Sequence, residues 1–101
     1  MARTPIHPGE ILSDELAELR TSSAALARIL RVPTNRISQI LNGRRAITAD
    51  TSLRLSKWMG TSPEFWLNLQ NAYELRLAQR QLAEEIRHIP RRAAARHSAV
   101  G

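Results

Sequence analysis

The 101-residue sequence contains no cysteine and only three histidines, His7, His88 and His97. Without cysteine there are no disulfides and no thiolate zinc sites, which is typical of a protein that stays in the reducing cytoplasm. The histidines are far apart and lack the paired spacing of metal ligands. We therefore expect a cytoplasmic protein with no metal and no cofactor.

Long apolar runs and catalytic groupings are also missing. No stretch is long enough to cross a bilayer, and residues 1–9 contain no apolar leader region. Glu84 and Glu85 are adjacent, so they do not share a helix face, and Ser22, Ser23 and Ser38 have no neighbouring base. The chain has no glycine-rich phosphate loop. We expect neither a membrane partner nor an enzyme.

Acidic residues are absent where the basic residues are densest. The net charge is +6, and residues 20–45 carry six arginines and no acid, whereas residues 1–19 have a net charge of −3. The last segment, residues 76–101, is also basic, with a net charge of +4. A basic block attracts a polyanion such as DNA if its side chains share one face.

What the sequence does contain is helical periodicity. Five segments place apolar or small residues three or four positions apart, and none shows the alternation of a strand. The stripes, in chain order, are Leu12, Leu16 and Leu19; Leu26, Ile29 and Leu30; Ile37, Ile40 and Leu41; Ser52, Leu55, Ser56 and Met59; and Trp66, Leu69, Tyr73 and Leu77, which Leu75, Leu82 and Ile86 extend.

Capping and stop residues set the predicted helix ends. A serine at 22–23, Thr48 and Ser62 are good N-caps, Gly43 and Gly60 are natural C-terminal stops, and Pro90 ends the last helix. The first helix is expected from Gly9 to about Arg20. The chain is thus predicted to be all-α, with one five-helix domain over residues 1–90 and a disordered basic tail over 91–101.

Residues 22–43 form the most informative block. A short helix, a tight turn at residues 31–33 and a second helix at 33–42 have the layout of a helix-turn-helix. The isoleucines and Leu41 can anchor the second helix from behind. Its polar side chains then face outward as candidates for base readout, namely Thr34, Asn35, Arg36, Ser38 and Gln39.

Four residues beside this helix are candidates for phosphate contacts. Arg44 and Arg45 follow it directly, and Ser22 and Ser23 stand at the start of the preceding helix. A polar helix face is by itself most often only solvated. The coincidence of turn, polar face and acid-free basic block favours double-stranded operator DNA as the partner, with Arg36 and Gln39 the strongest candidates for readout.

The four aromatic residues, Trp58, Phe65, Trp66 and Tyr73, have two interpretations. They pack between the fourth and fifth helices, or some of them form a homodimer seam, which a repressor of two half-sites requires. We expect Trp66 in the core and the fifth helix partly at the dimer interface.

The segment LARILRVPTNRISQILNGRRAIT, followed by SLRLSKWMGTSPEFWLNLQ, resembles HigA-type antitoxins with a Cro/repressor-like helix-turn-helix, as does HPGEIL at His7 to Leu12. The resemblance covers roughly residues 6–80. It implies an antitoxin that binds a RelE/HigB-like mRNA-cleaving toxin and represses its own type II operon as a dimer. Ala24 departs from a wider pattern in which a glutamine holds a phosphate, and Ser52 and Ser56 stand where alanine is frequent.

Two other functions stay open at this point. One is a stand-alone or phage-type repressor without a toxin, and the other is a protein-interaction module that binds no DNA. The acidic first helix (Glu10, Asp14, Glu15 and Glu18) is one possible face for a basic toxin, although acids on an exposed helix are ordinary.

Overall fold

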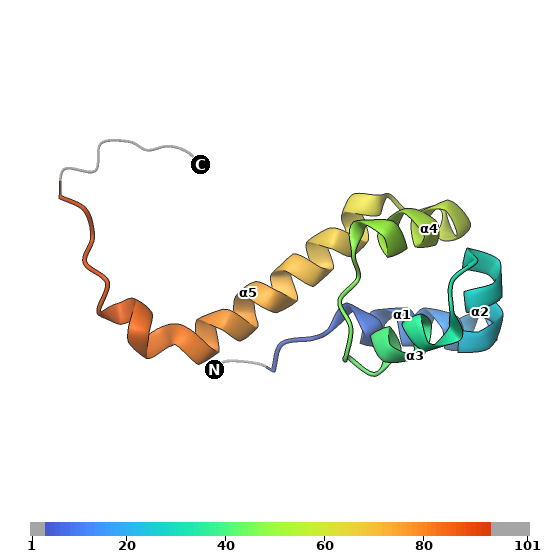
Figure 1. The fold of residues 1–101 in the computed structure, drawn as a ribbon, viewed down its shortest axis with the longest axis horizontal. Helices are drawn as coiled ribbons and strands as arrows, with labels where there is room; N and C mark the ends of the chain where they lie inside the picture. The colour runs from blue at the N-terminus through green and yellow to red at the C-terminus, as the bar shows by residue number, and fades with distance from the viewer. Residues whose placement is uncertain (1–3, 94–101) are drawn as a thin grey trace.

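The computed structural model describes residues 4–93, which form five helices and no strand (Figure 1). The helices are α1 (Pro8–Glu18), α2 (Ser23–Leu30), α3 (Thr34–Leu41), α4 (Ala49–Met59) and α5 (Pro63–Arg87). The predicted all-α class and the long last helix are confirmed. The predicted disordered tail, residues 91–101, lies outside the described residues from position 94 onward.

Local capping explains where the helices begin. The side chains of Ser22, Thr48 and Ser62 accept hydrogen bonds from the backbone N–H groups three residues later, at distances of 3.1, 3.5 and 3.1 Å. Such caps satisfy orphan donors of the first turn. At the other end of α4, Gly60 adopts a left-handed conformation with φ of 83°. The first helix ends two residues before the predicted Arg20, with Leu19 as its C-cap.

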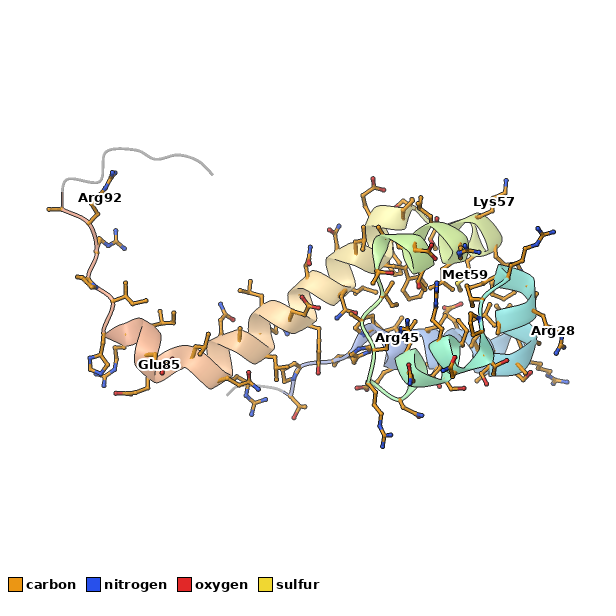
Figure 2. The ribbon with its side chains drawn as sticks, viewed as in Figure 1. Arg28, Arg45, Lys57, Met59, Glu85 and Arg92 are labelled. Atoms are coloured by element: carbon orange, nitrogen blue, oxygen red, sulfur yellow. The ribbon has the colours of Figure 1, made fainter. Side chains whose placement is uncertain are left out.

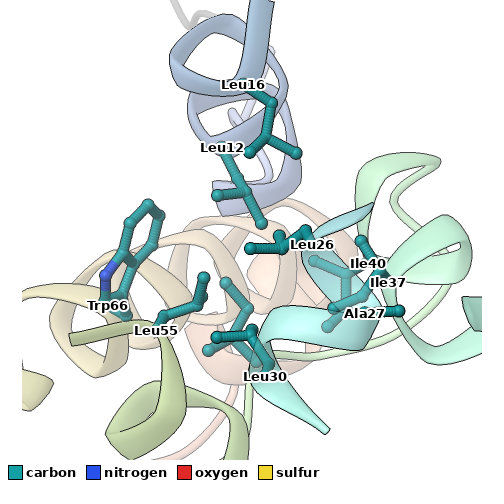
Figure 3. Close-up of a cluster of buried hydrophobic side chains, with 10 residues drawn as sticks. Leu12, Leu16, Leu26, Ala27, Leu30, Ile37, Ile40, Leu55 and Trp66 are labelled. Carbon is teal, nitrogen blue, oxygen red and sulfur yellow. The ribbon is translucent and has the colours of Figure 1, made fainter. Parts of the chain in front are cut away.

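The core lies between α1, α2, α3, α4 and the first turns of α5. Figure 3 shows its side chains converging from all these elements. Its buried hydrophobic members are Leu12, Leu16, Leu26, Ala27, Leu30, Ile37, Ile40, Ile47, Leu55 and Trp66. The two serines of α4 donate to backbone carbonyls, Ser52 to that of Pro63 and Ser56 to that of Leu53. The Ser52 hydroxyl thus joins α4 to α5.

The second half of α5 projects away from this body (Figure 1). Leu75, Leu82 and Ile86 were predicted to extend its apolar face, and they are 60%, 42% and 54% exposed. Ile29 on α2 also differs from its predicted stripe, since it is 46% exposed. Both differences arise because periodicity defines a helix face without showing whether another element covers it. None of the helices described within residues 4–93 is both long and apolar enough to cross a membrane.

Candidate nucleic-acid interface

The turn between α2 and α3 fixes the angle of the helix-turn-helix. Arg31 caps α2 in a left-handed conformation with φ of 62°. The N–H of Val32 donates to the carbonyl of Ala27 at 3.0 Å, and Pro33 is the extended N-cap of α3. This closes α2 with a hydrogen bond that spans six residues, as in a Schellman turn. The three residues between α2 and α3 therefore change the direction of the chain without a glycine.

Helix α3, the predicted recognition helix, is apolar on the side that faces the core and polar on the opposite side. Ile37 and Ile40 are completely buried, while Thr34, Asn35 and Gln39 are exposed. Ser38 is half-buried. An eight-residue helix with a buried apolar ridge cannot rotate without breaking the core, so its polar side chains are presented in a fixed register.

Arg36 is also on α3, but it is engaged within the protein. Its guanidinium donates to the carboxylate of Asp50 at 2.7 Å, and its side chain is 24% exposed. The same carboxylate oxygen accepts from Nε of Arg54 at 2.8 Å. Hydrogen bonds from Arg54 and then Arg36 lower the pKa of Asp50 below its usual value. The expectation that Arg36 simply points outward is therefore incomplete, because a residue in the first turn of α4 binds it.

Arg54 extends this network to α2. Its Nη1 donates to the carbonyl of Leu30 at 2.8 Å, which satisfies a terminal acceptor of that helix. One polar network therefore connects the ends of α2, α3 and α4. The position of Asp50 in the first turn of a helix is the only feature of the sequence that points to this network.

The loop after α3 brings Arg44 and Arg45 beside Gln39. Both arginines are exposed, and Arg45 is labelled in Figure 2. The Arg45 side chain donates to the side-chain oxygen of Gln39 at 3.1 Å. The N–H of Arg44 donates to the carbonyl of Gln39 at 2.8 Å. Candidate base-reading and phosphate-binding residues thus lie together at the C-terminal end of α3.

The two candidate serines have different surroundings. Ser22 is exposed and caps α2, so its oxygen already accepts from the N–H of Ala25 at 3.1 Å. Ser23 is half-buried and is the first residue of the helix. The hydroxyl proton of Ser22 and the first N–H groups of α2 are still donors that an anion can use.

The HPGEIL segment supports the same region from α1. His7 is the N-cap of α1, where its Nδ1 accepts from the N–H of Gly9 at 2.8 Å, and its ring lies edge-on to that of Tyr73 at 4.9 Å. Burial lowers the pKa of His7, and a hydrogen bond to the backbone of Arg45 opposes this shift. The histidine thus connects α1 and α5 to the loop that carries the two arginines.

Gly9 lies against the backbone of α3. A Cβ atom built at this position would be 1.8 Å from the carbonyl oxygen of Ile40. Only a residue without a side chain allows α1 and α3 to approach this closely. Sequence reasoning found the motif but not this contact, which joins residues far apart in the chain.

Gln70 fixes the same loop from α5. It is 5% exposed, its Oε1 accepts from the N–H of Ile47 at 2.8 Å, and its Nε2 donates to Glu74 at 2.9 Å. A buried glutamine with both ends of its amide satisfied restrains the backbone that it contacts. The only sequence signal was its place in the Trp66-Leu67-Asn68-Leu69-Gln70 segment.

The aromatic residues divide between core and surface. Trp66 is 1% exposed and donates to the hydroxyl of Thr61 at 3.1 Å. Phe65 contacts its ring edge-on at 5.0 Å but is itself 42% exposed. Trp58 and Tyr73 are half-buried. Within residues 4–93, no group of three or more acidic or histidine side chains has the arrangement of a metal site.

Comparison with known proteins gives the relationships of the chain. A family model described as a helix-turn-helix matches residues 13–66. A HigA-family addiction module antidote protein of Coxiella burnetii has a structure 51% identical to this chain, with a TM-score of 0.86, over 89% of this chain and all of that one. The Pseudomonas aeruginosa antitoxin HigA, solved with the higBA promoter, is 43% identical with a TM-score of 0.84, over 88% of this chain and 98% of that one. Antitoxin HigA-1 of Vibrio cholerae is 35% identical over 86% of this chain and 83% of its own length. The protein described here belongs to the HigA family of helix-turn-helix antitoxins.

Proposed function

We propose that the protein is a HigA-type antitoxin that binds its own operator as a homodimer and neutralises a RelE/HigB-like mRNA-cleaving toxin. The observation that carries the DNA-binding part is the geometry of α3. Its isoleucines are fully buried, its exposed Thr34, Asn35 and Gln39 face outward, and Arg44 and Arg45 lie beside its end. The Pseudomonas HigA relative, which was solved with promoter DNA, supports this proposal.

In this proposal, α3 enters the major groove and reads base edges. Gln39 and Asn35 have the amide groups that pair with adenine, and Arg36 has the guanidinium that pairs with guanine. Thr34 and Ser38 make permissive contacts. Arg36 reads a base by leaving Asp50, which keeps its second partner, Arg54.

Arg44, Arg45, Ser22 and Ser23 set the register on the phosphates. The arginine side chains are exposed at the end of α3, and Ser22 and Ser23 are at the start of α2. Two separated phosphate contacts hold a recognition helix at a defined depth and angle without reading sequence. These four residues therefore determine affinity more than base preference.

The projecting half of α5 is the proposed homodimer seam. Leu75, Leu82 and Ile86 are all more than 40% exposed, and no other element of the described chain covers them. A second copy would bury these three apolar side chains and place two recognition helices on two half-sites of a pseudo-palindromic operator. Residues 1–90 would then act as one DNA-binding domain in the cytoplasm. They would work by binding DNA and the toxin and would catalyse no reaction.

A mobility-shift experiment with the DNA upstream of the gene tests the DNA-binding proposal. Gln39→Ala is expected to cost about 1–3 kcal/mol per half-site on the operator and to relax base preference. Gln79→Ala, which removes an exposed glutamine on α5, is the matched control. Because Gln39 accepts from Arg45, Arg45→Ala is measured in parallel and should weaken operator and random DNA alike. A Gln39→Ala protein with unchanged discrimination would contradict the assignment.

The toxin part has its own test. Co-expression with the neighbouring reading frame should yield a complex that co-purifies and should relieve growth arrest. A protein that binds its operator but forms no complex with any neighbouring product would instead be a stand-alone repressor.

A further inference from the structure

The loop between α3 and α4 carries two candidate phosphate-binding arginines, and a hydrogen bond fixes each of its ends. At its start, the N–H of Arg44 donates to the carbonyl of Gln39 at 2.8 Å. At its end, the N–H of Ile47 donates to Gln70 of α5, also at 2.8 Å. Between these points, the backbone of Arg45 forms no hydrogen bond with any other backbone group in the described part of the chain. A side chain from another element is therefore needed to fix this backbone.

His7 is the side chain that meets the loop at this point. It precedes α1 and is only 5% exposed. A Cβ atom built at Gly43 would lie 3.8 Å from Cγ of His7, so the imidazole lies directly beside the turn that ends α3. The ring forms a hydrogen bond to the backbone of Arg45, and its edge-on contact with Tyr73 at 4.9 Å restricts its rotation. The imidazole is thus enclosed between the loop and α5.

The hydrogen bonds of the imidazole determine which nitrogen carries the proton. Nδ1 accepts from the N–H of Gly9 at 2.8 Å, so the proton of the neutral ring is on Nε2. Nε2 is then the donor to the backbone of Arg45, whose acceptor is the carbonyl oxygen. Burial lowers the pKa of His7 and so favours this neutral ring, which has one acceptor and one donor. The residue thus joins the start of α1 to the loop, which a helix cap alone would not do.

We infer that His7 is a positioning residue for DNA binding, whose Nε2 holds the backbone of Arg45 so that the guanidinium is presented to a phosphate. This inference rests on the proposed function, in which Arg45 contacts a phosphate. The Arg45 side chain is exposed and donates to Gln39 at 3.1 Å, so a fixed backbone keeps the guanidinium beside the base-reading face of α3.

The size of the effect follows from the order that His7 imposes. Fixing the backbone of one residue costs enough free energy to change an affinity by roughly five- to thirtyfold. Because His7 orders the backbone of Arg45 before DNA arrives, the complex forms without this cost. A loop released from His7 would have to be ordered each time the protein binds.

Two substitutions at position 7 separate the two hydrogen bonds of the imidazole. In His7→Asn, the side-chain oxygen can replace Nδ1 and keep the cap on Gly9, but no donor reaches Arg45. In His7→Gln, the longer side chain places its amide nitrogen near the position of Nε2, so the donor is kept and the cap is weakened. His88→Asn is the matched control, because the His88 side chain is 70% exposed at the far end of α5. Mobility shifts measure the affinity of each full-length variant for the DNA upstream of the gene and for random DNA of the same length.

We expect His7→Asn to bind both DNAs roughly five- to thirtyfold more weakly per protomer than the unchanged chain. His7→Gln should bind more tightly than His7→Asn, and His88→Asn should bind as the unchanged chain does. A role in capping alone predicts the opposite order, because asparagine is a good N-cap and glutamine is not. Full affinity in His7→Asn, or equal losses in His7→Asn and His7→Gln, overturns the inference. All binding is measured below the lowest thermal midpoint of the set, so that every variant is folded.

A double-mutant cycle shows whether His7 acts through Arg45. If it does, His7→Asn should weaken binding by less than about twofold once Arg45 is alanine, because no guanidinium is left to position. Fully additive losses would assign the effect of His7 to general stability and overturn the inference while the DNA-binding function stands. If the unchanged chain binds the upstream DNA no better than random DNA, the operator part of the proposed function fails, and the inference fails with it.

Discussion

Replacing Gly9 with alanine should displace α3 from α1. The added Cβ would stand 1.8 Å from the carbonyl oxygen of Ile40 and 2.8 Å from its carbonyl carbon. Real Cβ contacts essentially never fall below 3.0 Å, so the two backbones must separate by about 1.2 Å. The obstacle is backbone rather than a flexible side-chain end, so no rotamer change relieves it.

The cost of this separation can be estimated from the structure. Overpacking between elements costs about 1–3 kcal/mol. Movement of the backbone at Gly9 also disturbs the cap bond to His7, which contributes about 1 kcal/mol. Alanine returns at most about 1 kcal/mol through its helix propensity. The expected net loss, with the full gain from alanine subtracted, is about 1–3 kcal/mol of unfolding free energy, or roughly 4–24 °C in the thermal midpoint.

Urea unfolding followed by tryptophan fluorescence gives this quantity directly, because Trp66 is buried in the core. Gly60→Ala is the control. It introduces strain at φ of 83° but meets no atom within 4 Å, so it should cost only about 1–2 kcal/mol. Gly9→Ala should also weaken operator binding at temperatures where the protein stays folded, since Ile40 is on α3. A Gly9→Ala protein as stable as the unchanged chain would refute the close-approach argument.

Three further predictions concern the same region. Arg44→Ala should weaken all DNA about equally and reduce the slope of log affinity against log salt by roughly one unit; an unchanged slope would remove Arg44 from the phosphate contacts. The lowered pKa of His7 means that the folded state favours the neutral ring. The contribution of His7 to the free energy of unfolding is therefore complete above its ordinary pKa of 6.5 and declines as the pH falls through its lower pKa in the folded state. His7→Asn keeps a capping acceptor without titrating, so urea midpoints at acidic and neutral pH should differ less than in the unchanged protein; an equal difference would assign the acid sensitivity elsewhere. Gln70→Leu should cost about 1–3 kcal/mol because it leaves the N–H of Ile47 unpaired in the interior, and calorimetry that finds no loss would show that this bond is dispensable.

Much of the fold could be predicted from short-range patterns. Ser22, Thr48 and Ser62 cap the helices because a side-chain oxygen reaches an N–H only three residues away. Gly60 ends α4 because its own backbone tolerates a positive φ. These effects depend on a few neighbouring residues, so the amino-acid order contains them.

The contacts that position the candidate interface lie beyond such patterns. Gln70 reaches Ile47 across 23 residues, and Arg54 reaches Leu30 across 24. Periodicity placed Ile29 and Leu75 on apolar stripes, but the arrangement of the other helices leaves both exposed. Arg36 shows both sides of this limit. Its place on the polar face of α3 follows from spacing, whereas its ion pair with Asp50 depends on how α4 packs.

That ion pair has a consequence for the way the protein would search DNA. On DNA that is not the operator, the Arg36 guanidinium can stay paired with Asp50. A mismatched base then leaves no unpaired charge on Arg36, so the protein can slide along the DNA with little energetic cost. If Arg36 reads guanine as proposed, the two acceptors of that base compete with the Asp50 carboxylate for the guanidinium. Arg54 would then remain as the partner of Asp50. Base selectivity at this position would then depend on the exchange of Arg36 between Asp50 and guanine. A stronger Arg36–Asp50 pair would raise the discrimination between bases but would slow the formation of the specific complex.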